Sequence, residues 1–106
     1  MARITSAFFL DSNDRPVTES IEIVRKWEEF NYAFVALKSP SDGKIYEFCL
    51  LGEREESNIQ FVFLSLPPRF GDGRSDDLIV YKYLDEAKLV SLSKEELACA
   101  SRLWND

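Results

Sequence analysis

Histidine is absent from the 106 residues of this chain. Without an imidazole, the Ser-His-Asp and Cys-His mechanisms of catalysis are excluded, and so are zinc and haem sites that need a histidine ligand. There are only two cysteines, Cys49 and Cys99, and their spacing fits no Cys-x-x-Cys metal motif. We therefore expect no metal, no cofactor and no catalytic residues, and we expect both cysteines to be reduced core thiols.

Long apolar runs are also lacking. No stretch approaches the ~20 apolar residues that a membrane-spanning helix needs. The first ten residues contain only a short apolar run, without the longer segment and cleavage site of a signal peptide. These features predict a soluble, cytoplasmic protein that does not contact membranes.

Basic residues are outnumbered. Thirteen Lys and Arg stand against nineteen Asp and Glu, which gives a formal net charge of −6. The halves 1–53 and 54–106 each carry −3, from nine acids with six bases and from ten acids with seven bases. Because contacts to phosphates need a positive surface, this balance argues against direct binding of nucleic acid.

The composition that remains is that of one ordinary globular domain, with 45% hydrophobic and 13% aromatic residues. Residues 4–10 read as a strand that ends at the turn-forming residues 11–14. Residues 18–30 contain β-branched types, but Arg25 breaks strict alternation because it would share a face with Ile23 and Trp27. On a helical wheel the apolar residues of this segment gather on one arc, so the sequence predicts an amphipathic helix here, capped by Thr18.

The rest of the chain alternates between strands and turns. Aromatic-rich runs on either side of Asp42-Gly43 predict a β-hairpin, and Ser93 with Glu96 three residues later forms a capping box that begins a helix over about 93–104. The fold class predicted is α+β, a mostly antiparallel sheet of about five strands with helices over about 18–30 and 93–104 on one face. The segments expected after the first helix are strands 32–38 and 44–51, a charged loop 52–58, strands 59–66, 78–84 and 88–92, and a long loop 67–77.

The loop 67–77 is a candidate ligand site. Arg69 and Arg74 suit an anion, and Asp72, Asp76 and Asp77 suit a hard cation, although the loop fits neither the phosphate-binding nor the EF-hand spacing. A solvated connection is the simpler interpretation. If the strand face that carries Tyr81 and Tyr83 is open, these side chains would join the two arginines in a small ligand-binding or enzymatic domain.

A different hypothesis uses the acidic surplus. A small acidic domain is attracted to basic grooves, as immunity proteins that neutralise nuclease toxins and small phage inhibitors of host nucleases are. We expect such a domain to inhibit a basic protein partner, a nuclease or another nucleic-acid-binding protein. A homodimer, or a larger homo-oligomeric structural module, is a third alternative because the runs 32–38 and 59–66 are apolar on both faces. The acids in predicted loops are the candidate partner-binding residues: Glu53, Glu55, Glu56, Asp72, Asp76 and Asp77.

Overall fold

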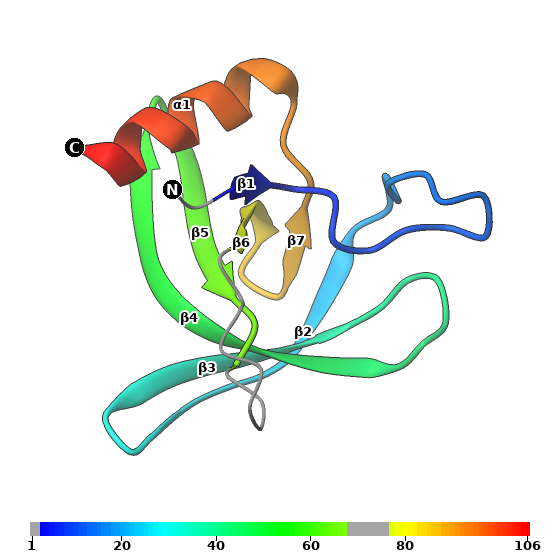
Figure 1. The fold of residues 1–106 in the computed structure, drawn as a ribbon. Helices are drawn as coiled ribbons and strands as arrows, with labels where there is room; N and C mark the ends of the chain where they lie inside the picture. Colours follow the sequence, from blue (N-terminus) through cyan, green and yellow to red (C-terminus); the bar gives the residue numbers. More distant parts are fainter. Residues whose placement is uncertain (1–2, 68–76) are drawn as a thin grey trace.

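The computed structural model describes residues 3–67 and 77–106. Within these ranges the chain forms seven strands and one C-terminal helix (Figure 1). In chain order the elements are β1 (Arg3–Thr5), β2 (Ile21–Glu29), β3 (Tyr32–Lys38), β4 (Ile45–Glu56), β5 (Ile59–Ser65), β6 (Asp77–Asp85), β7 (Lys88–Val90) and α1 (Lys94–Asn105).

The strands from β2 to β7 pair in sequence order, each antiparallel to the next. β7 also pairs with β2, so these six strands close on themselves. β1 adds to β6 in parallel, with Arg3 opposite Asp77. The sheet therefore has an inner face, turned toward its own axis, and an outer face.

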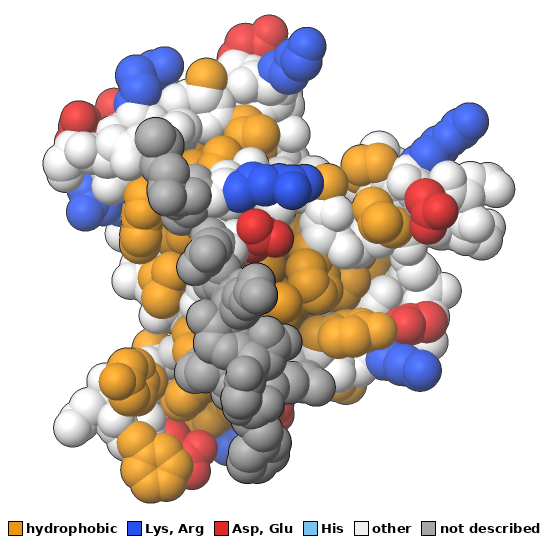
Figure 2. Space-filling model, in the orientation of Figure 1, with side chains coloured by type: hydrophobic (Ala, Val, Ile, Leu, Met, Phe, Trp, Pro, Cys, Tyr) orange, Lys and Arg blue, Asp and Glu red, His pale blue; other side chains and the backbone are white. Residues whose placement is uncertain are grey.

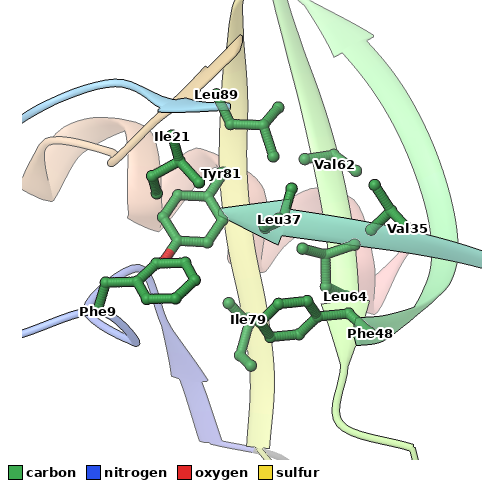
Figure 3. Packing of buried hydrophobic residues seen from close by; sticks show 10 residues of the cluster. All are labelled: Phe9, Ile21, Val35, Leu37, Phe48, Val62, Leu64, Ile79, Tyr81 and Leu89. Atoms are coloured by element: carbon green, nitrogen blue, oxygen red, sulfur yellow. The ribbon is translucent and has the colours of Figure 1, made fainter. Parts of the chain in front are cut away.

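The inner face is filled by apolar side chains from every strand of the closed sheet (Figure 3). Phe9, from the segment after β1, closes one end, where its ring meets those of Tyr46 and Phe48 at centroid distances of 5.6 and 6.2 Å. Closed sheets of so few strands have only enough interior for side chains. The inner cluster consists of Phe9, Ile21, Val35, Leu37, Phe48, Val62, Leu64, Ile79, Tyr81 and Leu89.

A second core lies outside the sheet, beneath α1. Ala100 is fully buried against a cluster that contains Phe61 and Phe63, and the Trp104 ring lies 5.1 Å from that of Phe63. The predicted capping box is confirmed: the Ser93 hydroxyl accepts from the Glu96 amide, and the Glu96 carboxylate accepts from the Ser93 amide. The α1 helix thus covers β5 and β6 and meets the end of β4 at Arg54 and Glu56. It leaves the outer face of β2, β3 and the first half of β4 to other contacts.

The predicted helix over 18–30 is wrong, because these residues form β2. Ile23 pairs with Leu37 and Arg25 pairs with Ala36, so Val24 is an extra residue in a β-bulge. A bulge reverses which face the following residues occupy. Ile21 and Ile23 alternate with polar residues, but after the bulge the alternation is displaced by one residue. The spacing of the apolar residues from Ile21 to Trp27 therefore resembles that of an amphipathic helix.

Several other expectations need correction. In the part of the chain that the structure describes, the sheet has seven strands rather than about five, and one helix rather than two packs on it. β1 ends at Thr5 instead of extending to Leu10, and the expected loop 52–58 is mostly strand, since β4 continues to Glu56 past a second bulge at Leu51. The hairpin around Asp42-Gly43 and the strand β5 are confirmed, and the strand predicted over 88–92 is present as β7 but ends at Val90.

Candidate functional site

The outer face of β2 and β3 carries aromatic side chains. Trp27 and Phe34 are opposite each other in the register, and their rings stack with centroids 5.4 Å apart. The Arg25 guanidinium lies 4.3 Å from the centre of the Trp27 ring. Tyr32, on the same face of β3, leaves 66% of its surface exposed. We call the residues Trp27, Tyr32 and Phe34 the outer aromatic face.

The turn that joins β2 to β3 presents a further aromatic ring. Phe30 and Asn31 both have positive φ, 53° and 67°, as a two-residue turn of the I′ type requires. The β4–β5 turn has the same geometry with Ser57 and Asn58. Left-handed backbone is unfavourable for a bulky residue, yet Phe30 occupies it with 81% of its surface exposed. Hydrophobic side chains gather where this turn projects from the molecule (Figure 2).

A polar network closes one end of the inner face. The Lys26 ammonium donates to the Tyr83 hydroxyl at 3.0 Å and lies 3.6 Å from the Glu53 carboxylate, to which that hydroxyl donates. The hydrogen bond with Tyr83 raises the pKa of Lys26, and burial followed by Glu53 raises the pKa of Tyr83. Both groups therefore hold their protons more firmly than usual, which suits a structural link and not a nucleophile or general base.

Tyr81 lies inside the sheet and has only 1% of its surface exposed (Figure 3). Tyr81 shares a strand face with Ile79 and Tyr83, and this face is the filled inner face. The ligand site predicted from the sequence required this face to be open, and it is not. Burial raises the pKa of the Tyr81 hydroxyl well above its ordinary value, against a smaller opposite effect of the backbone at Phe9 and Phe8. Tyr81 is therefore a core residue and does not line an accessible ligand site.

This burial predicts a loss of stability in alkali. The folded state holds the Tyr81 proton more tightly than the unfolded state does. The folded protein is therefore fully stable below the pKa of Tyr81 in the unfolded chain, and it loses stability as the pH rises from there toward the pKa of Tyr81 in the folded chain. Between pH ~8 and ~11 we expect Tyr81 to account for a loss of about 1.4 kcal/mol. Urea unfolding at both pH values should show a smaller loss for Tyr81→Phe. Tyr32→Phe, at an exposed position, should match the parent; equal losses in all three proteins would contradict the assignment.

The acids predicted to bind a partner are dispersed. By strand register, Glu53 and Glu55 lie on the inner-face side of β4, while Glu56 points outward toward α1. Asp77 is exposed at the start of β6, opposite Arg3 in β1. The structure thus does not bring these four acids together. The remaining predicted residues lie outside the described residues: Arg69, Asp72, Arg74 and Asp76.

The cysteines are both free and partly exposed, so they are less buried than expected. Cys99 Sγ donates to the Glu56 carboxylate at 2.6 Å, and this hydrogen bond raises the pKa of the Cys99 thiol. Because the thiolate is the reactive form, Cys99 is deactivated by its neighbour.

Sequence reasoning did not separate the outer aromatic face from the core. The predicted helix placed Trp27 and Phe30 on its buried arc. One available signal pointed elsewhere: Phe30-Asn31 separates two apolar-rich segments, as a two-residue hairpin turn does.

Comparisons with family models, curated proteins and solved structures gave no match for this chain. In the ranges 3–67 and 77–106, no three acidic or cysteine side chains come together in a way that would hold a metal ion. The one helix in these ranges is too short and too polar to cross a bilayer.

Proposed function

We propose that the protein works by binding a basic macromolecular partner through its outer aromatic face. The observation that carries this proposal is the stacked pair Trp27–Phe34 beside the exposed Tyr32, on a part of the sheet that α1 leaves uncovered. Aromatic rings supply a large contact area at a low cost in side-chain entropy, and tryptophan and tyrosine dominate the binding energy of many interfaces.

The surroundings of the outer aromatic face support a protein partner. Ile45, on the outer side of β4, is 50% exposed, and the exposed acids Glu29 and Glu47 lie on the same side of the sheet. An apolar centre with a charged rim is the usual arrangement at protein interfaces. By contrast, the inner face is filled with side chains, which favours binding over chemistry on an enclosed small molecule.

The net charge of −6 favours a cationic partner. Acids dispersed over the surface act at a distance, so they accelerate the encounter more than they strengthen the final contact. In this proposal Glu53, Glu55 and Asp77 contribute to attraction, and the outer aromatic face makes the contact. A nuclease or another nucleic-acid-binding protein has the required positive surface, and the complex would inhibit it by occupying that surface.

The test compares three baits in capture from the source organism, followed by affinity measurements on the captured protein. The baits are the parent, a Trp27→Ser/Tyr32→Ser variant, and Leu84→Ser as a control, since Leu84 is 60% exposed on another part of the sheet. We expect a basic protein that parent and control both bind, with affinity for the double variant reduced about thirtyfold or more.

The affinity of the parent should also fall as salt rises. Two results would overturn the proposal: retention of the partner by the double variant with undiminished affinity, or a captured partner that is acidic and insensitive to salt.

A further inference from the structure

Among the described residues, one edge of β2 has no neighbouring strand over most of its length. β7 pairs with β2 only at Ile21 and Glu22, and the Ile23 amide donates to the Ala87 carbonyl at 2.9 Å. From Arg25 to Glu29, β2 is paired with β3 on one side, and no other described strand lies along the opposite side. Such an edge presents backbone donors and acceptors that can pair with another strand.

The turn fixes which residues face this edge. In a two-residue hairpin the flanking pair, Glu29 and Tyr32, direct their backbone groups toward each other, and the direction alternates along the strand. Trp27 and Arg25 therefore face β3, while Lys26 and Glu28 present their N–H and C=O groups to the free edge.

The charges along this edge are antisymmetric about Trp27. Two cations, Arg25 and Lys26, precede it, and two acids, Glu28 and Glu29, follow it. In an antiparallel pair of two such strands centred on Trp27, Lys26 is opposite Glu28 of the other copy, and Arg25 is opposite Glu29. Opposite charges are thus directly opposed at every position, which is favourable. The pair of Arg25 and Glu29 contributes most, because the Lys26 ammonium is already held by Tyr83 and Glu53 of its own chain.

We propose that two copies of this chain form a symmetric dimer by antiparallel pairing of their β2 edges about Trp27. Neighbouring registers fit less well. Only Lys26 and Glu28 direct their backbone groups toward the other copy. The register between the two copies can therefore shift only in steps of two residues. One such shift puts Lys26 opposite Lys26 and the other puts Glu28 opposite Glu28, and like charges in these positions are unfavourable.

The chosen register also accounts for exposed apolar groups. It brings Phe30 of one copy level with Val24 of the other; these residues are 81% and 41% exposed in the single chain. The two Trp27 rings meet across the symmetry axis, each already stacked on its own Phe34. The outer aromatic faces of both copies would then join in one continuous surface, but the dimer itself uses the strand edge and does not rest on the proposed partner.

The test reverses one charge in each of two proteins, Arg25→Glu and Glu29→Lys. Neither position belongs to the network of Lys26, Tyr83 and Glu53, so the fold should remain, as circular dichroism would verify. In a dimer of either variant alone, residues 25 and 29 of the two copies carry charges of the same sign. The symmetry of the dimer repeats this unfavourable pair. Mixed in equal amounts, they restore opposite charges at both positions, because the glutamate introduced into the first variant faces the lysine introduced into the second.

We expect sedimentation equilibrium to show a parent dimer that dissociates on dilution. Each variant alone should dimerise about tenfold more weakly or worse, and native mass spectrometry of the mixture should show mainly the heterodimer. Glu47→Lys, the same charge change at an exposed site on β4, should dimerise like the parent. A parent that stays monomeric at high micromolar concentration, or variants that dimerise normally alone, would overturn the proposal.

Discussion

Phe48→Ala should lower the free energy of unfolding by about 4 kcal/mol, the largest effect we expect from a single truncation. Phe48 is fully buried on the inner face, with its ring centroid 5.1 Å from that of Phe8 in an edge-to-face arrangement. Removal of the ring leaves a void that rigid neighbouring strands cannot fill. For a domain of this size the melting temperature should fall by roughly 20 °C.

Phe30→Ala is the matched control for this truncation. It removes the same atoms from a side chain that is 81% exposed, so stability should change by no more than about 0.5 kcal/mol. Urea unfolding of both variants measures the difference. If Phe48→Ala proved as harmless as Phe30→Ala, the inside of the closed sheet would not be a packed core, and a ligand space there would have to be reconsidered.

The second large effect concerns the packing of α1 on the sheet. Ala100→Glu places a carboxylate with no partner in a cluster formed with Phe61 and Phe63. Burying an unpaired charge costs so much that we expect the helix to leave the sheet, with a loss of about 3 kcal/mol or more. Ala98→Glu makes the same change at an exposed position of α1 and should be nearly neutral.

Tryptophan fluorescence can follow this undocking directly. In a Trp27→Phe background Trp104 is the only tryptophan, and its ring contacts Phe63. Ala100→Glu should shift its emission toward that of a solvated indole, while Ala98→Glu should not. An unchanged spectrum together with unchanged stability would show that α1 contributes little to the outer core.

Elements with a strong local signal were predictable from the sequence. The Asp42-Gly43 turn located the β3–β4 hairpin, and Ser93 with Glu96 located the start of α1. These signals depend only on residues close together in the chain, and local backbone preferences decide them. The strand β5, apolar on both faces, is likewise covered on both, by the inner cluster and by α1.

The two main failures, in β2 and in β4, occurred at β-bulges. In β2 the extra residue Val24 puts Arg25 and Trp27 on the face opposite to that of Ile23, and the Arg25 cation lies over the Trp27 ring. In β4 the extra residue Leu51 divides one strand into what reads as a strand and a loop. A bulge is favoured by contacts between strands that are distant in sequence, so alternation alone does not predict it. Closure of the sheet through β7 depends on the same distant contacts.

The candidate site was predictable only in part. The acidic surplus is a property of composition, but its distribution depends on which side of β4 each glutamate occupies. Glu53 and Glu56 separate because strand neighbours three positions apart point to opposite faces. The outer aromatic face was missed for the same reason that β2 was, since a helix would have buried Trp27.

The closure of the sheet is uneven around its circumference. β7 has three residues and meets β2 at only two register positions, whereas β2 and β3 are paired over seven. Thermal opening should therefore begin at this narrow seam, where few backbone bonds must break at once. Amide protons there would exchange with solvent long before those of β5, and β2 could swing outward with its hairpin while the rest of the molecule stays folded.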